Sequence, residues 1–335
     1  MKKGMKALKR VAAFGLALAL SGCGASGTSS QSTAGQGQDA KTEAAGGDAG
    51  TADLPTLRVA MMPFITSLPT EYIRKNKLDE KAGFKMDTIM FATGAPMNEA
   101  LAADLWDVGA MGAAAVTGVA NYDMMIIGEV LESTDGLGVF VKPDSPIAQA
   151  KGYNPSYPNV YGSAVTVQKA DILYPKSTSA HYLLATWLRI LGLSEKDVKL
   201  QEMEPTPALS AFTGGVGDAV ALWAPLTYEA EAKGFKSVAN SKDCGITQLV
   251  LLVANRRFAD QHPEQVQAFL KMYMRGIEAL RAKPAKELAV DYVRFYKEWT
   301  GRELTPEMAV ADIQSHPVFT LDEQLAMFAP GGSVQ

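Results

Sequence analysis

Cysteine and histidine are scarce in this chain. It has two cysteines, Cys23 and Cys244, and three histidines. Two cysteines exclude a disulfide framework, and we expect Cys244 to be a small buried residue. The histidines show no metal-ligand spacing with cysteine and no Gly-x-Ser-x-Gly partner, and there is no phosphate-binding Gly-Lys-Thr loop. The sequence therefore predicts no metal, no cofactor, no catalytic residue and no enzymatic activity.

Basic residues are in the minority once the first 22 residues are set aside. The chain has 32 Lys and Arg and 36 Asp and Glu. Residues 1–22 hold five of the basic residues and none of the acidic ones, which leaves 27 against 36 and a net charge of −9. Such a charge excludes nucleic acid and anionic membrane surfaces as expected partners. After the leader, no apolar run reaches the ~20 residues that cross a bilayer.

The leader has the three parts of a secretory signal in order. Five basic residues come first: Lys2, Lys3, Lys6, Lys9 and Arg10. The apolar run Val11 to Leu20 follows, and it is about half as long as a membrane span. Leu20-Ser21-Gly22-Cys23 then resembles the bacterial lipoprotein signal, in which the chain is cut before a cysteine that carries the lipid. We predict a signal peptide at 1–22 and lipidation, as by palmitate, of Cys23; an ordinary secreted protein is the alternative.

Residues 24–54 are mostly Gly, Ser, Ala, Thr and Gln. A segment of this composition cannot bury enough apolar surface to offset its ordering entropy. We therefore predict that 23–54 is a flexible tether, with an end-to-end distance of ~30 Å for about 30 such residues. The protein is then expected on the extracytoplasmic face of the cell membrane, held by its lipid and free to reach a neighbouring membrane protein.

From residue 55 onward, short apolar runs alternate with helical patterns, which favours an α/β fold with mainly parallel sheets and flanking helices. The predicted strands are 57–62, 85–92, 107–111, 124–129, 137–141, 171–174, 198–203, 219–223 and 246–254. The predicted helices are 66–77, 96–103, 113–120, 179–191, one capped by Thr206 with Pro207 and ending at Gly214, one ending at Gly234, 263–281, 284–299 and 306–313.

The order of these elements divides the chain. Two α/β stretches come first, and mostly helical sequence follows residue 254. Two lobes joined near 135–142 and 236–246 explain this order. We predict lobe 1 from 55–137 plus 241–335, with the C-terminal helices packed on it, and lobe 2 from 138–240. The loop 151–163 carries several tyrosines, which we expect to pack against the domain beneath; a rim over a ligand is the alternative.

Several stretches together resemble a known family. They are Tyr174–Leu184, Pro205–Phe212, Gly217–Val220, Leu222–Pro225, Val253–Ala259 with His262-Pro263, and Asp107–Gly109 with Gly112. In this order and spacing they resemble the solute-binding lipoproteins of ABC importers, in the branch of nitrate, aliphatic sulfonate, taurine and thiamine-precursor receptors. The resemblance implies a two-lobed periplasmic-binding-protein-like (type II) clamshell that closes on a small-molecule solute, works as a monomer, and delivers the solute to ABC permease subunits.

Four strand-to-helix corners are predicted to form the site: in order, 62–66, 93–96, 111–113 and 177–181. Ligands bind beyond the carboxyl ends of strands, where helix N-termini present free N–H groups. The predicted ligand-binding residues are Phe64, Ile65, Gly94, Ala95, Met111, Gly112, Thr178, Ser179, Ala180, His181 and Trp223. The roles of the fourth corner and of Trp223 come from the resemblance.

Each of these residues also has an ordinary structural interpretation. Thr178 and Ser179 are equally explained as helix caps, the two glycines as turns, Trp223 as core and His181 as an interface residue. Glu129 and Asp135, near the crossing between lobes, are candidates to meet a ligand ammonium, or simply loop carboxylates. No arginine stands at the corners, so an anion would be held by N–H groups, hydroxyls and helix dipoles.

The sequence thus predicts an extracytoplasmic receptor that captures a sulfonate, nitrate, taurine or related organic anion. A binding protein or synthase-like enzyme for a thiamine pyrimidine precursor is one alternative, although the cysteine-rich iron-binding motif of that enzyme group is missing. A sensory ligand-binding protein is the other.

Overall fold

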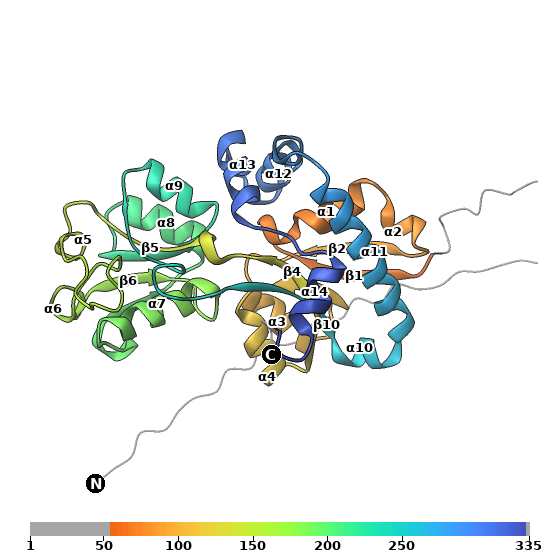
Figure 1. The fold of residues 1–335 in the computed structure, drawn as a ribbon, viewed down its shortest axis with the longest axis horizontal. Coiled ribbons are helices and arrows are strands. Elements are labelled where there is room, and N and C mark those ends of the chain that lie inside the picture. Colours follow the sequence, from red (N-terminus) through yellow and green to blue (C-terminus); the bar gives the residue numbers. More distant parts are fainter. Residues whose placement is uncertain (1–53, 333–335) are drawn as a thin grey trace, which may run out of the picture. The chain divides into compact units, whose positions relative to one another are not determined.

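A computed structural model describes residues 54–332, which form two five-stranded sheets surrounded by helices (Figure 1). The first sheet has the strand order β2-β1-β3-β10-β4. Its strands are β1 (Thr56–Met61), β2 (Lys85–Met90), β3 (Val108–Met111), β4 (Met124–Glu132) and β10 (Leu249–Asn255). The second sheet has the order β7-β6-β8-β5-β9. Its strands are β5 (Leu137–Val141), β6 (Asp171–Tyr174), β7 (Lys199–Glu202), β8 (Ala219–Trp223) and β9 (Lys236–Asn240).

The two sheets repeat one pairing pattern. In the first, β1 runs parallel to β2 and β3, while β10 is antiparallel to β3 and β4. In the second, β6 runs parallel to β7 and β8, while β5 is antiparallel to β8 and β9. The α/β class is as predicted, but the pairing is mixed rather than mainly parallel. The reason is that β5 and β10 are the strands entered directly from the other sheet, without a crossover helix.

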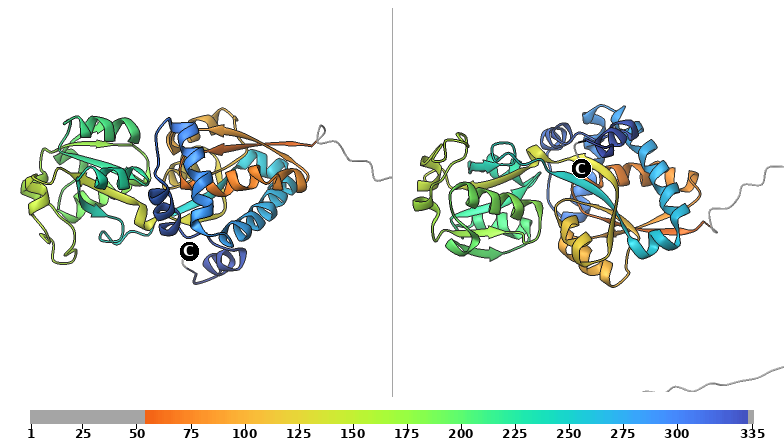
Figure 2. Two further views of the ribbon diagram at one scale, coloured as in Figure 1. Left: turned by 90° about the horizontal axis from the view of Figure 1, so that it is seen from above. Right: turned by 60° about the horizontal axis from the view of Figure 1, so that its bottom comes forward.

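Helices of separate chain segments cover each sheet, as the views in Figures 1 and 2 show. Around the second sheet lie α5 (Pro146–Gln149), α6 (Ala164–Val167), α7 (Ser179–Ile190), α8 (Pro205–Thr213) and α9 (Leu226–Ala232). Around the first lie α1 (Leu68–Lys75), α2 (Leu78–Lys81), α3 (Gly94–Ala102), α4 (Ala114–Asn121), α10 (Arg256–Gln261), α11 (Pro263–Arg281), α12 (Ala285–Thr300), α13 (Pro306–Ser315) and α14 (Leu321–Phe328). The 3₁₀ turns η2 (Ile65–Ser67), η3 (Thr134–Gly136) and η4 (Glu195–Asp197) complete the elements. No helix within residues 54–332 has the length and hydropathy to cross a bilayer.

Local capping explains most of the helix boundaries. Pro263 and Pro306 occupy the first turns of α11 and α13, where a missing N–H costs nothing. Gly301 ends α12 with φ of 69°, a left-handed conformation that glycine adopts without strain. The predicted cap at Thr206 is wrong: α8 begins two residues earlier than predicted, at Pro205, after Glu204. The predicted helix 66–77 is divided into η2 and α1, which ends at Lys75, and the short helix α2 begins separately at Leu78.

The C-terminal helices share the core of the first sheet, as predicted. Phe269 and Tyr273 of α11 and Tyr292 of α12 are buried in the same cluster as the strand residues Leu57 and Val59. The second sheet has its own apolar clusters, in which Trp187 is fully buried and donates its indole N–H to the carbonyl of Tyr161, 2.8 Å away. Cys244 is a buried free thiol, as expected, and burial raises its pKa to about 12.

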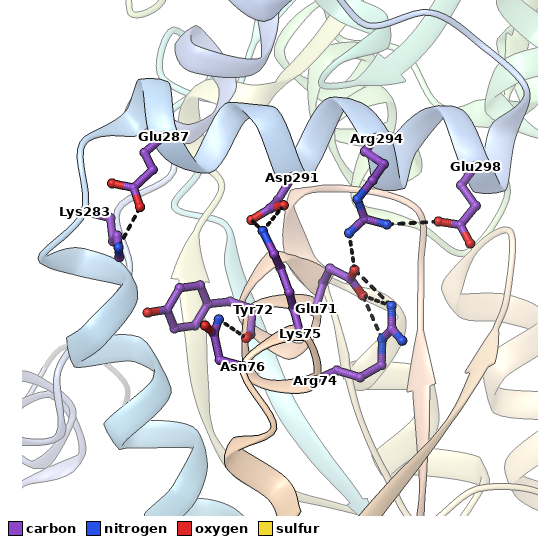
Figure 3. A network of polar contacts seen from close by, with 10 residues as sticks. All are labelled: Glu71, Tyr72, Arg74, Lys75, Asn76, Lys283, Glu287, Asp291, Arg294 and Glu298. Atoms are coloured by element: carbon purple, nitrogen blue, oxygen red, sulfur yellow. Dashed lines mark hydrogen bonds and ion pairs between the residues drawn. The ribbon is translucent and has the colours of Figure 1, made fainter.

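An ion-pair network fixes α12 on α1 (Figure 3). The Glu71 carboxylate is buried and receives hydrogen bonds from two guanidinium groups, Arg74 at 3.0 Å and Arg294 at 2.6 Å. Lys75 pairs with Asp291 at 2.6 Å along the same helix face. Because the Glu71 carboxylate pairs with arginines of two different helices, the C-terminal helices are bound electrostatically to the first sheet as well as through the core.

Candidate functional site

A cavity of about 60 Å³ lies where strand-to-helix corners of both sheets meet. It has room for roughly four to six water-sized groups. The lining residues are Met62, Phe64, Ile65, Thr66, Gly94, Gly112, Ala113, Ala114, Ser133, Leu137, Thr178, Ser179, Trp223, Ala224, Val250 and His316. They come from the ends of β1, β3, β6 and β8, from the starts of α3, α4 and α7, from the crossing segments, and from the end of α13.

Most of the predicted corner residues are brought together here. Those that line the cavity are Phe64, Ile65, Gly94, Gly112, Thr178, Ser179 and Trp223. Whether they bind a ligand stays a prediction. Ala95 is half-buried on α3 outside the lining, and Met111 and Ala180 are fully buried in the structure.

His181 also lies outside this cavity. Its Nε2 is 2.8 Å from the Glu195 carboxylate, its Nδ1 accepts the N–H of Ser177 at 3.1 Å, and its ring packs edge-on against Tyr174. All three partners belong to the segment from β6 to β7, so these contacts fit an ordinary structural role within the second sheet's region, and ligand contact stays a prediction. The residue instead borders a second hollow with Tyr182, Gln248 and Phe328.

Phe64 and Trp223 form the aromatic wall. Trp223 ends β8 and is partly buried against the apolar clusters of both sheets. Its ring meets the ring of Phe64 edge-on, with centroids 5.4 Å apart. This geometry is the favourable arrangement of aromatic pairs. The tryptophan therefore serves as core and as cavity wall at once.

The hydroxyls of the fourth corner are already engaged. Thr178 accepts the N–H of His181 and donates to the carbonyl of Pro175 at 2.6 Å, so it caps α7 and has no hydrogen left. Ser179 Oγ accepts the N–H of Ala113 from the first sheet's α4 corner, at 3.1 Å. That bond leaves the Ser179 hydroxyl hydrogen for a ligand. Capping thus explains Thr178, while Ser179 joins the two sheets.

Further contacts connect the helices of the two sheets around the cavity. Tyr228 on α9 bonds Ser315 at the end of α13, at 2.9 Å. Arg302 of the segment after α12 pairs with Glu229 of α9. Thr93, before α3, lies 3.5 Å from the carboxylate of Glu204, before α8. The cavity is therefore flanked by contacts that would break if the two sheets separated.

The cavity walls carry no Lys, Arg, Asp or Glu among the described residues, and His316 is the titratable group that lines them. Sequence reasoning missed both His316 and Ser133. Their positions in the chain differ by 183, and the imidazole Nε2 lies 3.1 Å from Ser133 Oγ. Only the packing of α13 against η3 brings them together, so no local pattern announces the pair.

Glu129 is a buried carboxylate that lies away from the cavity lining. Neither of its carboxylate oxygens has a hydrogen-bond partner in the described chain. Burial, reinforced by the charge of Glu132, raises the pKa of Glu129 to about 7. Gln324 of α14 bonds the backbone N–H and C=O of the same residue, each at 2.9 Å. Asp135 is exposed at the crossing segment. Nowhere in residues 54–332 do three His, Cys, Asp or Glu side chains gather as a metal would require.

Comparison with known proteins places this architecture among binding proteins. The sequence profile of the NMT1-like family matches residues 50–293. A putative ABC transporter periplasmic binding protein of Brachyspira hyodysenteriae is 35% identical over 289 residues, covering 86% of this chain and 83% of the relative. A putative aliphatic sulfonates-binding protein of Bacillus subtilis is 27% identical over 201 residues, covering 59% of this chain and 56% of the relative.

Solved structures share the fold. The alkanesulfonate-binding protein SsuA of Xanthomonas axonopodis pv. citri, bound to MOPS, matches with a TM-score of 0.63 and 21% identity. The match covers 79% of this chain and 86% of that chain. At this identity the likeness concerns the fold alone.

Proposed function

The chain belongs to the NMT1-like family, and we propose that it is the solute-binding component of an ABC importer that captures a small organic anion between its two sheets. The resemblance that the sequence predicts, to ABC importer solute-binding proteins, is confirmed by the relatives. The two-lobed α/β fold agrees with the solved structures.

One observation carries the proposal: a small cavity lies between corners of both sheets, with an aromatic wall on one side and N–H and hydroxyl donors on the other. No side chain caps the N-termini of α3 and α4, which both start at the cavity. At the α4 corner the N–H groups of Ala113, Ala115 and Val116 are already bonded, so the uncapped start of α3 and the dipoles of both helices are what favour an oxyanion. The ring pair Phe64 and Trp223 suits a short apolar portion. An alkanesulfonate has both features.

The volume supports a compact ligand. A cavity with room for roughly four to six water-sized groups matches nitrate or a two-carbon sulfonate such as ethanesulfonate. Taurine has one non-hydrogen atom more than ethanesulfonate. A thiamine pyrimidine precursor is larger and needs the sheets to separate further. Hydrogen bonds to a charged ligand contribute about 1.5–3 kcal/mol each, so three or four of them, less association costs, give micromolar affinity.

Delivery to a permease completes the proposed role. Lipidation of Cys23, membrane anchoring on the extracytoplasmic face through the tether 23–54, and a monomeric state all come from the sequence, and Cys23 lies outside the described residues. The division into lobe 1 (55–137 plus 241–335) and lobe 2 (138–240) is part of the same proposal. Two crossing segments, 133–136 and 241–248, join the sheets and are the natural hinge.

A hydrolytic role has one observation in its favour. Ser133, His316 and Asp312 follow one another at 3.1 Å contacts, in the order of a nucleophile, a base and an orienting carboxylate. The relatives are binding proteins, so we favour recognition over chemistry. The two roles differ in whether the ligand is recovered unchanged.

A thermal-shift screen tests the receptor function. The panel contains nitrate, alkyl and aryl sulfonates, taurine, thiamine pyrimidines and aromatic carboxylates. A ligand at 100 times its dissociation constant stabilises the protein by about 2.7 kcal/mol, which shifts the melting temperature by a few degrees. A shift with small sulfonates supports the proposal, and a shift with pyrimidines alone transfers it to the thiamine-precursor alternative. A folded protein that no panel member stabilises would contradict it.

A further inference from the structure

A series of polar contacts connects the end of α13 with the cavity wall. The His316 side chain is 1% exposed, yet it lines the cavity beside Ser133 of the crossing segment. Its Nε2 lies 3.1 Å from Ser133 Oγ. Its Nδ1 lies 2.7 Å from the carbonyl oxygen of Asp312 and 3.1 Å from the carboxylate of the same residue. Gly136 leaves room for the ring, since a Cβ there would be 2.5 Å from His316 Nε2.

The contacts of Nδ1 decide which nitrogen changes its protonation. Both oxygen atoms of Asp312 that face Nδ1 are acceptors, so Nδ1 holds a hydrogen in either charge state of the ring. The second proton therefore enters and leaves at Nε2, the nitrogen that faces Ser133. With Nε2 bare, it accepts the Ser133 hydroxyl hydrogen. With Nε2 protonated, it donates to Ser133 Oγ, and the hydroxyl hydrogen is released toward the cavity.

The groups around the ring favour its charged form. Burial lowers the pKa of His316, but the contact with the Asp312 carboxylate and its charge, together with Asp135 on η3, outweigh burial and raise the pKa above its ordinary value. Tyr292 of α12 donates to the other Asp312 oxygen at 2.6 Å, and Tyr228 of α9 reaches Nδ1 only through Ser315. On the cavity side, no Lys, Arg, Asp or Glu faces the ring among the described residues.

We propose that Ser133 and His316 are the anion-recognition pair of the cavity, and that binding of an anion is coupled to uptake of one proton at His316 Nε2. The imidazolium supplies the positive charge that the corners lack, and the released Ser133 hydrogen donates to the ligand oxyanion. An ammonium of the same size meets the same charge and is rejected. This inference rests on the proposed function and names the group that selects the ligand's charge.

Calorimetric titration of the full chain with ethanesulfonate, and with ethylammonium as the cationic counterpart, tests the pair. Measurements run from pH 5.5 to about 7.5 in bis-Tris and in cacodylate, which contain no sulfonate and differ in ionisation enthalpy. Between the pKa values of free and bound His316, we expect ethanesulfonate to bind with a proton uptake that approaches one, and below both values with almost none. Its affinity should fall about tenfold per pH unit between the pKa values of free and bound His316. Ethylammonium should not bind.

Variants separate recognition from folding. Ser133→Ala and His316→Gln should each weaken ethanesulfonate binding at least tenfold, and His316→Gln should also remove the pH dependence. His262→Gln is the matched control, because His262 starts α11 outside the cavity lining. If His316→Gln does not fold, NMR of histidine-labelled wild type gives the same answer: ethanesulfonate should raise the pKa of His316 and leave those of His181 and His262 unchanged.

Two results would contradict the proposed role of Ser133 and His316, and they can be told apart. Wild-type binding with no pH dependence, or unchanged affinity in Ser133→Ala, removes the pair while the receptor function stands. Failure of the wild type to bind ethanesulfonate at any of these pH values overturns the sulfonate function and the pair with it.

Discussion

The ring of Phe64, which follows a strand of the first sheet, meets the ring of Trp223, which ends a strand of the second, at 5.4 Å between centroids and 85° between planes. The pair closes the cavity on its apolar side. It also makes the fluorescence of Trp223 a direct reporter of any ligand that enters between the sheets.

Replacing Trp223 by Ala should weaken ethanesulfonate binding at least tenfold, because the variant loses the wall and its contact with Phe64. Part of the tryptophan emission change on ligand addition should disappear with it. Trp299→Ala is the control, since Trp299 is 47% exposed on α12 and does not line the cavity. Unchanged affinity in a folded Trp223→Ala variant would remove this residue from the site.

Gly112→Ala should hold the sheets apart. A Cβ at this position would lie 2.5 Å from Ser179 Oγ, closer than real Cβ contacts allow. The bond from Ala113 N–H to Ser179 should break, and ligand affinity should fall by tenfold or more while each sheet keeps its core. The double variant Gly112→Ala/Ser179→Ala tests the cause, because removing the Oγ frees the space and should recover part of the affinity. Unchanged affinity in Gly112→Ala would mean that the close contact between Gly112 and Ser179 is not needed for binding.

Glu129→Gln should stabilise the protein at neutral and alkaline pH. The folded-state pKa of about 7 exceeds the ordinary value of 4.5, so the unfolded chain ionises first as pH rises. Through Glu129, the free energy of unfolding is therefore highest below pH 4.5 and falls by about 1.4 kcal/mol per pH unit up to about pH 7. Above pH 7 this effect of Glu129 no longer changes with pH. Chemical denaturation at pH 4.5 and 8 measures the slope, which should shrink in Glu129→Gln and persist in Glu99→Gln, an exposed control on α3. Equal slopes in both variants would contradict the unpaired, buried state of Glu129.

Glu71→Gln should destabilise the packing of α12 on α1 by about 1.5–3 kcal/mol, because two arginines then lose their carboxylate partner. Glu287→Gln, on α12 in Figure 3, is the comparison: its pair with Lys283 lies at the surface, where ion pairs contribute little. Denaturant midpoints of the two variants should differ clearly. Equal midpoints would show that the Glu71 network does not hold the C-terminal helices.

Cys23→Ser should release the protein from the membrane, since the predicted lipid attaches at this residue. Fractionation of cells, with labelled palmitate in the wild type as the positive control, gives the measurement. A substituted protein that stays with the membrane fraction would exclude Cys23 as the anchor.

The sequence predicted helix ends best where a proline or a glycine marks them. Pro263, Pro306 and Gly192 mark helix ends that the structure retains, and the corners before α3, α4 and α7 do reach one cavity. The antiparallel course of β5 and β10 and the extra strand β9 depend on pairing with distant strands, which no local pattern encodes. The sequence leaves the role of Thr178 open between helix cap and ligand contact, and its two hydrogen bonds favour the helix cap.

His316 shows most clearly where sequence reasoning ended. Beside Pro317 it looks like a helix-boundary residue, and its partner Ser133 stands in a polar crossing segment. The pair forms only because α13 returns to η3 after the whole second sheet has been built. The positive charge that the corners lack is thus supplied by His316, which lies outside the stretches that resemble the family.

The most direct test of the account is calorimetric titration of the purified wild-type protein with ethanesulfonate at pH 6, followed by recovery of the ligand. We expect one ethanesulfonate per chain, a dissociation constant in the micromolar range, at least tenfold weaker binding in Trp223→Ala, and a chemically unchanged ligand. No binding by a folded protein, or a ligand recovered as a reaction product, would contradict the central claim.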